Sequence, residues 1–306
     1  KAKTDKIDSR IIANYGIEHW FTMAEFKASD DVYGELKMLG QQYRHYMKLH
    51  IMSLHELTHL LDYTMPGIKS MLASWNEGNR KDKLSDFVEQ FWHYDNIRCL
   101  SEAEFTKQYM NWAKEKKYHR SSSKAEAVYE LASSGIPTLS SSTPSTKMFV
   151  QEAISVLRTV DSSLSLILSR MQVLAKSLPE YSTVREMGGV GDVLAVKLIA
   201  EIGDVRRLHS AKALIAWAGI DPPPYESGQF VGTRRKITKR GSSTLRKVGY
   251  EVMRVLKSHP VPEDDAVYNY ILKKEGEGKS KKHAKIAGLN KFLRIYYARV
   301  NAVYHQ

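Results

Sequence analysis

Residues 150–178 read VQEAISVLRTVDSSLSLILSRMQVLAKSL, and this stretch decides the architecture of the chain. Its apolar residues follow one another at alternating steps of three and four positions. They are Val150, Ala153, Leu157, Val160, Leu164, Ile167, Met171, Leu174 and Leu178. This is the a/d seam of a coiled coil, and Pro179 ends it. The sequence therefore predicts one long helix with a continuous apolar stripe.

A second segment, residues 35–61, has the same periodicity and ends before Pro66 and Gly67. Its apolar positions are Leu36, Leu39, Tyr43, Met47, Ile51, Leu54, Leu57 and Leu61. The two long helices pair with each other as an antiparallel arm, or each pairs with a second subunit; the sequence leaves both open. Shorter helices are predicted near residues 8–15, 68–75, 84–92 and 102–116. Residues 121–124 and 140–146 are rich in Ser, Thr or Pro and predict turns or connections.

Composition restricts the class of protein. The chain has 306 residues, of which 42% are hydrophobic, so a packed core is feasible. Its net charge of +12 favours a polyanionic partner, most often a nucleic acid. The single cysteine, Cys99, excludes an intrachain disulfide framework and fits a reducing compartment. No apolar run is long enough to predict a membrane span or a signal peptide.

After Pro179 the sequence changes to a helix, a Gly188-Gly-Val-Gly191 turn and a second, mostly apolar helix. This order is the helix-hairpin-helix pattern. Gly189 and Gly191 would let the backbone approach phosphates, and the second helix offers free N–H groups at its N-terminus. A purely structural hairpin is the alternative.

The most chemically suggestive stretch is PPPYESGQFVGTRRKITKRG, residues 222–241. The proline run fixes the backbone of a shaped loop, and a glycine follows Ser227 directly. The cations that come next would attract phosphate. They include Arg234, Arg235, Lys236, Lys239 and Arg240. A serine hydroxyl beside a polyanion site outlines serine recombinase chemistry; the alternative is an incidental serine in a basic loop.

Two further patterns suggest metal ligands. Asp5 and Asp8 would share one face of a helix, where they could hold a divalent cation or simply be solvated. His55-Glu-Leu-Thr-His59 matches the H-E-x-x-H pattern of zinc peptidases, with Asn76-Glu77 downstream as the place of a third ligand. Two solvated histidines on a polar helix are the alternative, which the polar flanks and basic composition favour.

Three ordered signatures together resemble one family. Lys3-Thr-Asp5-Lys-Ile-Asp8-Ser resembles the last two acids of a DEDD tetrad in a RuvC-like domain. Gly189-Val-Gly191, continued by Glu201-Ile-Gly203-Asp204, resembles the hairpin signature, and Glu226-Ser227-Gly228 with Lys239-Arg-Gly241 and Leu245-Arg246 resembles the C-terminal signature. The family is the DEDD transposases of the insertion-sequence one-ten and eleven-eleven type, which act with a bridge RNA.

The resemblance implies a mainly α fold. Residues 1–30 would be the remnant of an RNase H/RuvC-like α/β domain, residues 31–180 a helical coiled-coil arm, and residues 181–306 a transposase domain with a helix-hairpin-helix. The family's first aspartate and its glutamate lie upstream of the region that matches. We therefore expect the natural protein to begin before Lys1, and the chain as given to be inactive on its own.

The resemblance also implies a function, DNA recombination at a target chosen by a guide RNA. Ser227 would be the nucleophile, and Asp5 and Asp8 would bind Mg²⁺. Nucleic acid would be bound by Gly189, Gly191, Arg234, Arg235, Lys239, Arg240 and Arg246. The protein would form a dimer or tetramer through the coiled coil, in the cytoplasm and on the nucleoid of a prokaryote. A non-catalytic helix-hairpin-helix nucleic-acid-binding protein is the main alternative.

Overall fold

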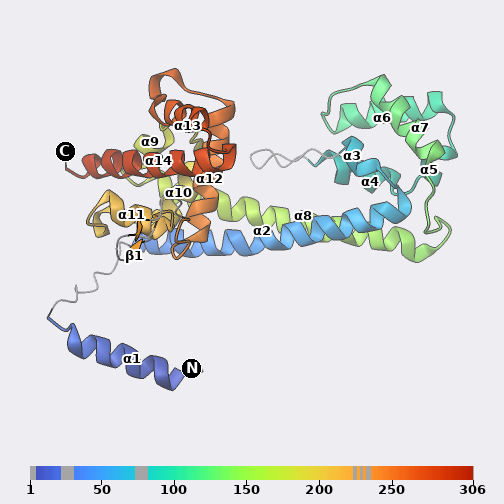
Figure 1. Ribbon diagram of the computed structural model, residues 1–306. Coiled ribbons are helices and arrows are strands. Elements are labelled where there is room, and N and C mark those ends of the chain that lie inside the picture. Colours follow the sequence, from blue (N-terminus) through green and yellow to red (C-terminus); the bar gives the residue numbers. More distant parts are fainter. Residues whose placement is uncertain are drawn as a thin grey trace.

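The computed structural model describes residues 5–21, 31–72, 82–222, 226–227, 230–231 and 236–305, and it confirms a mainly α fold (Figure 1). The N-terminal half contains α1 (Asp5–Glu18), α2 (Asp31–Thr64), α3 (Ile68–Leu72), α4 (Lys83–Phe91), α5 (Asp95–Arg98), α6 (Glu102–Glu115), α7 (Ser122–Ser134) and α8 (Pro144–Lys176). The C-terminal half contains α9 (Tyr181–Arg185), α10 (Asp192–Ile202), η1 (Val205–Arg207), α11 (Ala211–Ala218), β1 (Glu226–Ser227), β2 (Phe230–Val231), α12 (Ser243–Ser258), η2 (Pro262–Asp264), α13 (Ala266–Gly276) and α14 (Lys281–Val303).

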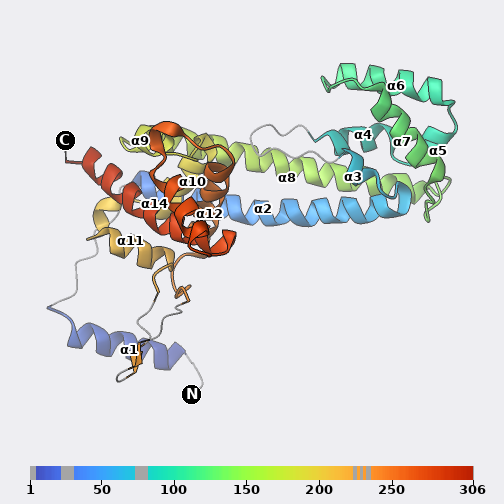
Figure 2. The same cartoon turned by 45° about the horizontal axis from the view of Figure 1, so that its top comes forward.

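Helices α2 and α8 run antiparallel along each other within one chain (Figures 1 and 2). Arg170 pairs with Glu35 at 2.8 Å near one end of the arm. His50 contacts Asp161 at 2.6 Å nearer its middle. The sequence left open whether the two long helices pair with each other or with a second subunit. In the structure they pair with each other. The prolines at positions 66 and 144 mark the end of α2 and the first turn of α8.

The predicted seam of α8 is largely buried. Val150, Leu157, Val160, Leu164, Met171 and Leu174 are all buried. Ile154 and Leu168 join them, while the predicted Ala153 and Ile167 are only partly covered. The stripe is therefore wider than a strict a/d seam, because α8 packs against further helices at both ends of the arm.

Helices α3 to α7 form a separate module at one end of the arm, which we call the tip (Figures 1 and 2). Its core is an aromatic cluster around Phe87, whose ring centroid lies 4.8 Å from Phe91 and 5.4 Å from Trp112. Ser101 caps α6 through a reciprocal capping box with Glu104. The turn predicted at residues 121–124 is wrong beyond its first residue: Ser121 caps α7 by accepting from the Lys124 amide.

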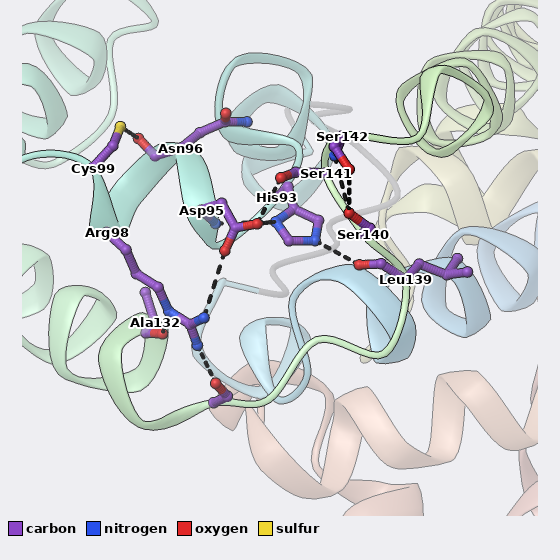
Figure 3. A network of polar contacts seen from close by, with 11 residues as sticks. His93, Asp95, Asn96, Arg98, Cys99, Ala132, Leu139, Ser140, Ser141 and Ser142 are labelled. Carbon is purple, nitrogen blue, oxygen red and sulfur yellow. Dashed lines mark hydrogen bonds and ion pairs between the residues drawn. The ribbon is translucent and has the colours of Figure 1, made fainter.

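A polar network around the buried His93 ties the tip to the segment before α8 (Figure 3). The His93 ring donates from Nε2 to the Leu139 carbonyl at 2.9 Å and accepts from the Asp95 amide at 3.0 Å. Ser141 donates its hydroxyl to the Asp95 carboxylate at 2.6 Å. Both ring nitrogens are satisfied by these neighbours, so the network holds the segment after α7 against α5.

The second core lies at the opposite end of the arm, where α9 to α14 pack on the start of α2 and the end of α8 (Figure 1). Gly249 and Gly288 sit where helices cross closely: a Cβ on Gly249 would lie 2.4 Å from Leu289. Glu180 is buried and accepts hydrogen bonds from the hydroxyls of Tyr33 at 2.6 Å and Tyr304 at 2.5 Å. Through Glu180, the start of α2 is joined to the C-terminal end of α14.

Helix α1 buries none of its residues. Residues 5–21 contain this one helix, so the remnant of an RNase H-like domain stays a prediction. In the part of the chain that the structure describes, no helix has the length and apolar character needed to cross a membrane.

Candidate functional site

The site predicted around Ser227 lies between α11 and α12. Ser227 belongs to β1, and its backbone pairs with Phe230 of β2 in an antiparallel register. The two residues on either side of the pair, Glu226 and Val231, pair in turn. The two short strands therefore form an antiparallel pair at the serine. From the proline run before Ser227, the sequence had predicted only a loop of fixed shape.

The base of this loop is closed by a set of backbone hydrogen bonds that we call the clamp. The Thr238 amide donates to the Asp221 carbonyl at 3.0 Å, the Lys239 amide to Gly219 at 2.9 Å, and the Ser242 amide to Trp217 at 2.7 Å. The Thr238 hydroxyl also donates to the Asp221 carboxylate at 2.7 Å. The segment that leaves α11 and the segment that enters α12 thus run alongside each other.

Two glycines make the clamp possible. Gly219 ends α11 in the left-handed conformation, with φ of 63°, as its position after an apolar helix predicts. A Cβ on Gly241 would lie 2.1 Å from the Trp217 carbonyl oxygen. The two backbones therefore approach more closely than any side chain would allow, and this fixes where the Ser227 loop begins and ends.

The predicted phosphate-binding cations have different environments. Lys239 and Arg240 are exposed beside the clamp. Arg246 is half-buried, and its Nη1 donates to the Ala218 carbonyl at 2.9 Å and the Gly241 carbonyl at 3.0 Å, so it holds the clamp together. Arg234 and Arg235 lie outside the described residues.

The two glycines of the predicted hairpin also differ. Gly189 is buried against α12, where a Cβ would lie 2.8 Å from the Val252 carbonyl oxygen. Its φ of 78° makes it a glycine position in any case. Gly191 is exposed, directly precedes α10 and has open space beside it. Of the two glycines, only Gly191 has the open space that a phosphate group would need. The helix-hairpin-helix itself stays a prediction.

Asp5 and Asp8 lie in the first turn of α1, and both are exposed. Among the described residues, no group of three or more His, Cys, Asp and Glu side chains could hold a metal ion. Mg²⁺ is nevertheless commonly held by one or two carboxylates together with water and substrate phosphates. The two carboxylates are of the donor type that Mg²⁺ prefers, and Mg²⁺ binding by this pair stays a prediction.

The zinc pattern on α2 places His55 and His59 on an exposed part of the arm. His59 Nε2 lies 3.0 Å from the Tyr63 hydroxyl, one helical turn further on. Asn76 and Glu77, where the sequence placed a third ligand, lie outside the described residues. The described part of the arm offers the two histidines a tyrosine and no third metal ligand.

Several cations that are not buried lie on α12 and in the first turns of α14, and we call this set, together with Tyr250, the basic face. It consists of Lys247, Tyr250, Arg254, Lys281, Lys282 and Lys285. The Lys285 Nζ lies 5.8 Å from the centre of the Tyr250 ring and joins the two helices. Within the described ranges no carboxylate forms an ion pair with these five cations. Three of the lysines occupy the first turns of α14, where the helix dipole disfavours positive charge. An anionic partner would relieve this cost.

Sequence reasoning missed the side chains behind the clamp. Glu201, in the last turn of α10, accepts from the Ser242 hydroxyl at 2.5 Å and from Arg44 of α2 at 2.9 Å. Ser242 also caps α12 by accepting from the Leu245 amide at 2.9 Å. The position of Ser242 before a helix was a readable capping signal, but its contact with α10 joins residues far apart in sequence.

Comparisons with known proteins agree with the signatures in the C-terminal half. Residues 181–269 match the model of the transposase IS116/IS110/IS902 family. The uncharacterized 44.8 kDa protein of insertion element IS116 from Streptomyces clavuligerus is 33% identical over 95 residues, 31% of this chain and 23% of that protein. The pilin gene-inverting protein of Moraxella bovis is 29% identical over 117 residues, 38% of this chain and 35% of its own.

The transposase for insertion sequence element IS1111A from Coxiella burnetii (strain RSA 493 / Nine Mile phase I) is 29% identical over 92 residues, 29% of this chain and 24% of that protein. This chain thus covers between 23% and 35% of the length of these curated relatives. The matched family segment contains the Gly189 turn, the Ser227 loop and the clamp. The comparisons therefore support the transposase IS116/IS110/IS902 family for the C-terminal part of this chain.

Proposed function

We propose that this protein is a DNA transposase or recombinase that cleaves and exchanges strands with Ser227 as its nucleophile. The observation that carries the proposal is the family match over residues 181–269, which contains the serine in a loop whose base is clamped. The names of two relatives, a transposase and a gene-inverting protein, describe DNA rearrangement.

The reaction begins when Ser227 Oγ attacks a backbone phosphorus. An O–P bond to the serine forms, the P–O bond to a sugar hydroxyl breaks, and the proton of the serine passes to the departing oxygen by way of a base or water. The product is a phosphoserine ester, which a second sugar hydroxyl can attack in the reverse sense. One phosphate ester replaces another in each step, so no nucleotide cofactor is required.

The transition state places negative charge on the nonbridging phosphate oxygens, and positioned cations stabilise it. Lys239 and Arg240 are the described, exposed candidates beside the clamp, and Arg234 and Arg235 precede them in the sequence. Arg246 Nη1 donates to the Ala218 and Gly241 carbonyls, and we propose that this arginine chiefly holds the clamp.

Asp5 and Asp8 would hold Mg²⁺ in this proposal. Bound there, the ion would supply Lewis-acid stabilisation of phosphate charge. The basic face on α12 and α14 would bind the sugar-phosphate backbone of DNA or of a guide RNA. The arm forms within one chain, and a dimer or tetramer through its outer faces remains part of the proposal.

The test is a covalent adduct. Incubation of the purified natural protein with target DNA and candidate guide RNA, followed by denaturing electrophoresis, should show a protein–DNA species that Ser227→Ala abolishes. Ser243→Ala, which changes an exposed serine at the start of α12, is the matched control and should keep the adduct. Nucleic-acid affinity should stay within about two-fold in both variants, because neither removes a cation.

A non-catalytic nucleic-acid-binding protein is the second candidate, since the basic face, whose cations form no ion pair with a described carboxylate, would serve such a protein equally well. This reading predicts strong, salt-dependent binding and no adduct in the unsubstituted protein. An adduct that persists in Ser227→Ala would contradict the assignment of the nucleophile.

A further inference from the structure

We propose that Glu201 is a positioning residue for Ser227: it fixes the clamp through Ser242 and connects it to the arm through Arg44. The proposal rests on the proposed function of Ser227. Glu201 belongs to α10 and has no place in the loop itself, so its influence passes through the contacts at the loop base.

The first step is the contact between Glu201 and Ser242. The Ser242 hydroxyl donates to Glu201 Oε1 at 2.5 Å while it accepts the Leu245 amide at 2.9 Å. Its own amide donates to the Trp217 carbonyl at 2.7 Å. Ser242 therefore has its donor and acceptor directions fixed by three elements, α10, α11 and α12. Loss of any one of these partners would let the segment that returns from the loop move.

The second step is the position of Ser242 in the clamp. It directly follows Gly241, whose backbone lies so close to α11 that a Cβ would meet the Trp217 carbonyl at 2.1 Å. A shift of Ser242 thus changes the closest backbone approach in the clamp. The loop that carries Ser227 is anchored on both sides here, at Asp221 and Thr238. A small displacement of such an anchor moves the residues beyond it.

The third step concerns the second carboxylate oxygen of Glu201, Oε2. Arg44 Nη1 lies 2.9 Å from Oε2, and the Glu201 side chain is 16% exposed while that of Arg44 is 41% exposed. The carboxylate is held between the two partners, one from the arm and one from the clamp. Because α2 reaches from this contact to the tip, the orientation of the arm and that of the loop are linked at one side chain.

The consequence concerns rate more than affinity. Misplacement of a reacting group by about 1 Å costs on the order of 100-fold in rate. Glu201→Ala should therefore slow formation of the Ser227 adduct by about 10- to 100-fold, with DNA affinity within about two-fold of the unsubstituted protein. Glu201→Gln keeps an acceptor for Ser242 and should restore most of the rate.

The experiment measures single-turnover adduct formation, DNA affinity and amide hydrogen exchange in the full chain. In Glu201→Ala, the amides of Thr238, Lys239 and Ser242 should exchange faster, because they form the clamp. Ser242→Asp should behave in the same way, since an aspartate still caps α12 but cannot donate to Glu201. Glu89→Ala removes another carboxylate–arginine pair, the one with Arg158 in the tip at the other end of the arm, and should change neither readout.

The outcomes separate the two proposals. If the unsubstituted natural protein forms no Ser227-dependent adduct, the proposed function is contradicted, and the positioning role falls with it. An adduct that forms at an unchanged rate in Glu201→Ala and Ser242→Asp contradicts the positioning role alone. Unchanged amide exchange in both variants contradicts it as well, because Glu201 would then not hold the clamp.

Discussion

At the residue scale, two neighbouring cations of α12 lie in different environments. Arg246 is half-buried and its Nη1 donates to two carbonyls of the clamp, whereas Lys247 is exposed and belongs to the basic face. The sequence placed Arg246 among the phosphate ligands because arginine suits phosphate. Arg246 Nη1 donates to two backbone carbonyl oxygens, which, like phosphate oxygens, are acceptors for a guanidinium. Phosphate binding by Arg246 stays a prediction.

This difference predicts two distinct effects of substitution. Arg246→Ala leaves two carbonyls without their donor and should lower the free energy of unfolding by about 1–3 kcal/mol. Lys247→Ala should stay within about 0.5 kcal/mol, but should weaken nucleic-acid binding and reduce its salt dependence by about one phosphate contact. Urea unfolding and binding titrations at several salt concentrations measure these effects. Equal destabilisation by both substitutions would argue against a clamp role for Arg246.

At the element scale, Asp264 joins three parts of the C-terminal core. Its carboxylate, in η2, accepts from the Gly188 amide at 2.8 Å before α10 and from Arg299 of α14 at 2.8 Å. Burial alone would raise the pKa of Asp264, but the hydrogen bonds from Arg299 and Gly188 outweigh it and hold that pKa below its ordinary value of 3.8. The ionised form is thus the one that stabilises the fold.

The direction of this shift gives a pH prediction. Because the folded pKa is depressed, the stabilisation is present above the unfolded pKa of 3.8 and is lost as pH falls through the lower, folded pKa. Asp264→Asn should cost about 1–3 kcal/mol at pH 7 and should flatten the loss of stability below pH ~4. Thermal unfolding across this range is the measurement. Asp62→Asn, at an exposed position of α2, should leave the pH profile unchanged.

At the scale of the whole molecule, two hydrophobic cores lie at opposite ends of the α2–α8 arm (Figure 2). The tip has its own core around Phe87, which is fully buried. The second core supports the Ser227 loop. The two cores are joined by long helices, so each core should unfold largely independently of the other.

Phe87→Ala tests this separation. Removal of a buried aromatic ring should cost about 3–5 kcal/mol, confined to the tip. In hydrogen exchange, α4 to α7 should lose protection while α10 to α14 keep it, and nucleic-acid binding should persist. Phe149→Ala, at a side chain 48% exposed on α8, is the control and should change little. Loss of protection throughout the chain would show that the two cores unfold as one unit.

The sequence by itself determined the long helices, their apolar stripe, the breaks at Pro66 and Pro179, and the region of the Ser227 loop. These are local properties, since helix periodicity and proline geometry depend on residues a few positions apart. It did not determine α5, whose four residues depend on what they pack against. It also missed the start of α7, because serines favour both turns and helix caps, and Ser121 proved to be a cap.

Only the tertiary structure decided that α2 and α8 pair within one chain, that Gly189 faces α12, and that Arg246 holds the clamp. It alone brought Glu201 to Ser242 and Arg44. Each of these features depends on contacts between residues that are distant in sequence. One residue type can also serve more than one role. A glycine permits a tight turn or a close helix contact, and an arginine binds phosphate or backbone carbonyls. The residue type sets which contacts are possible, and the packing of the chain selects among them.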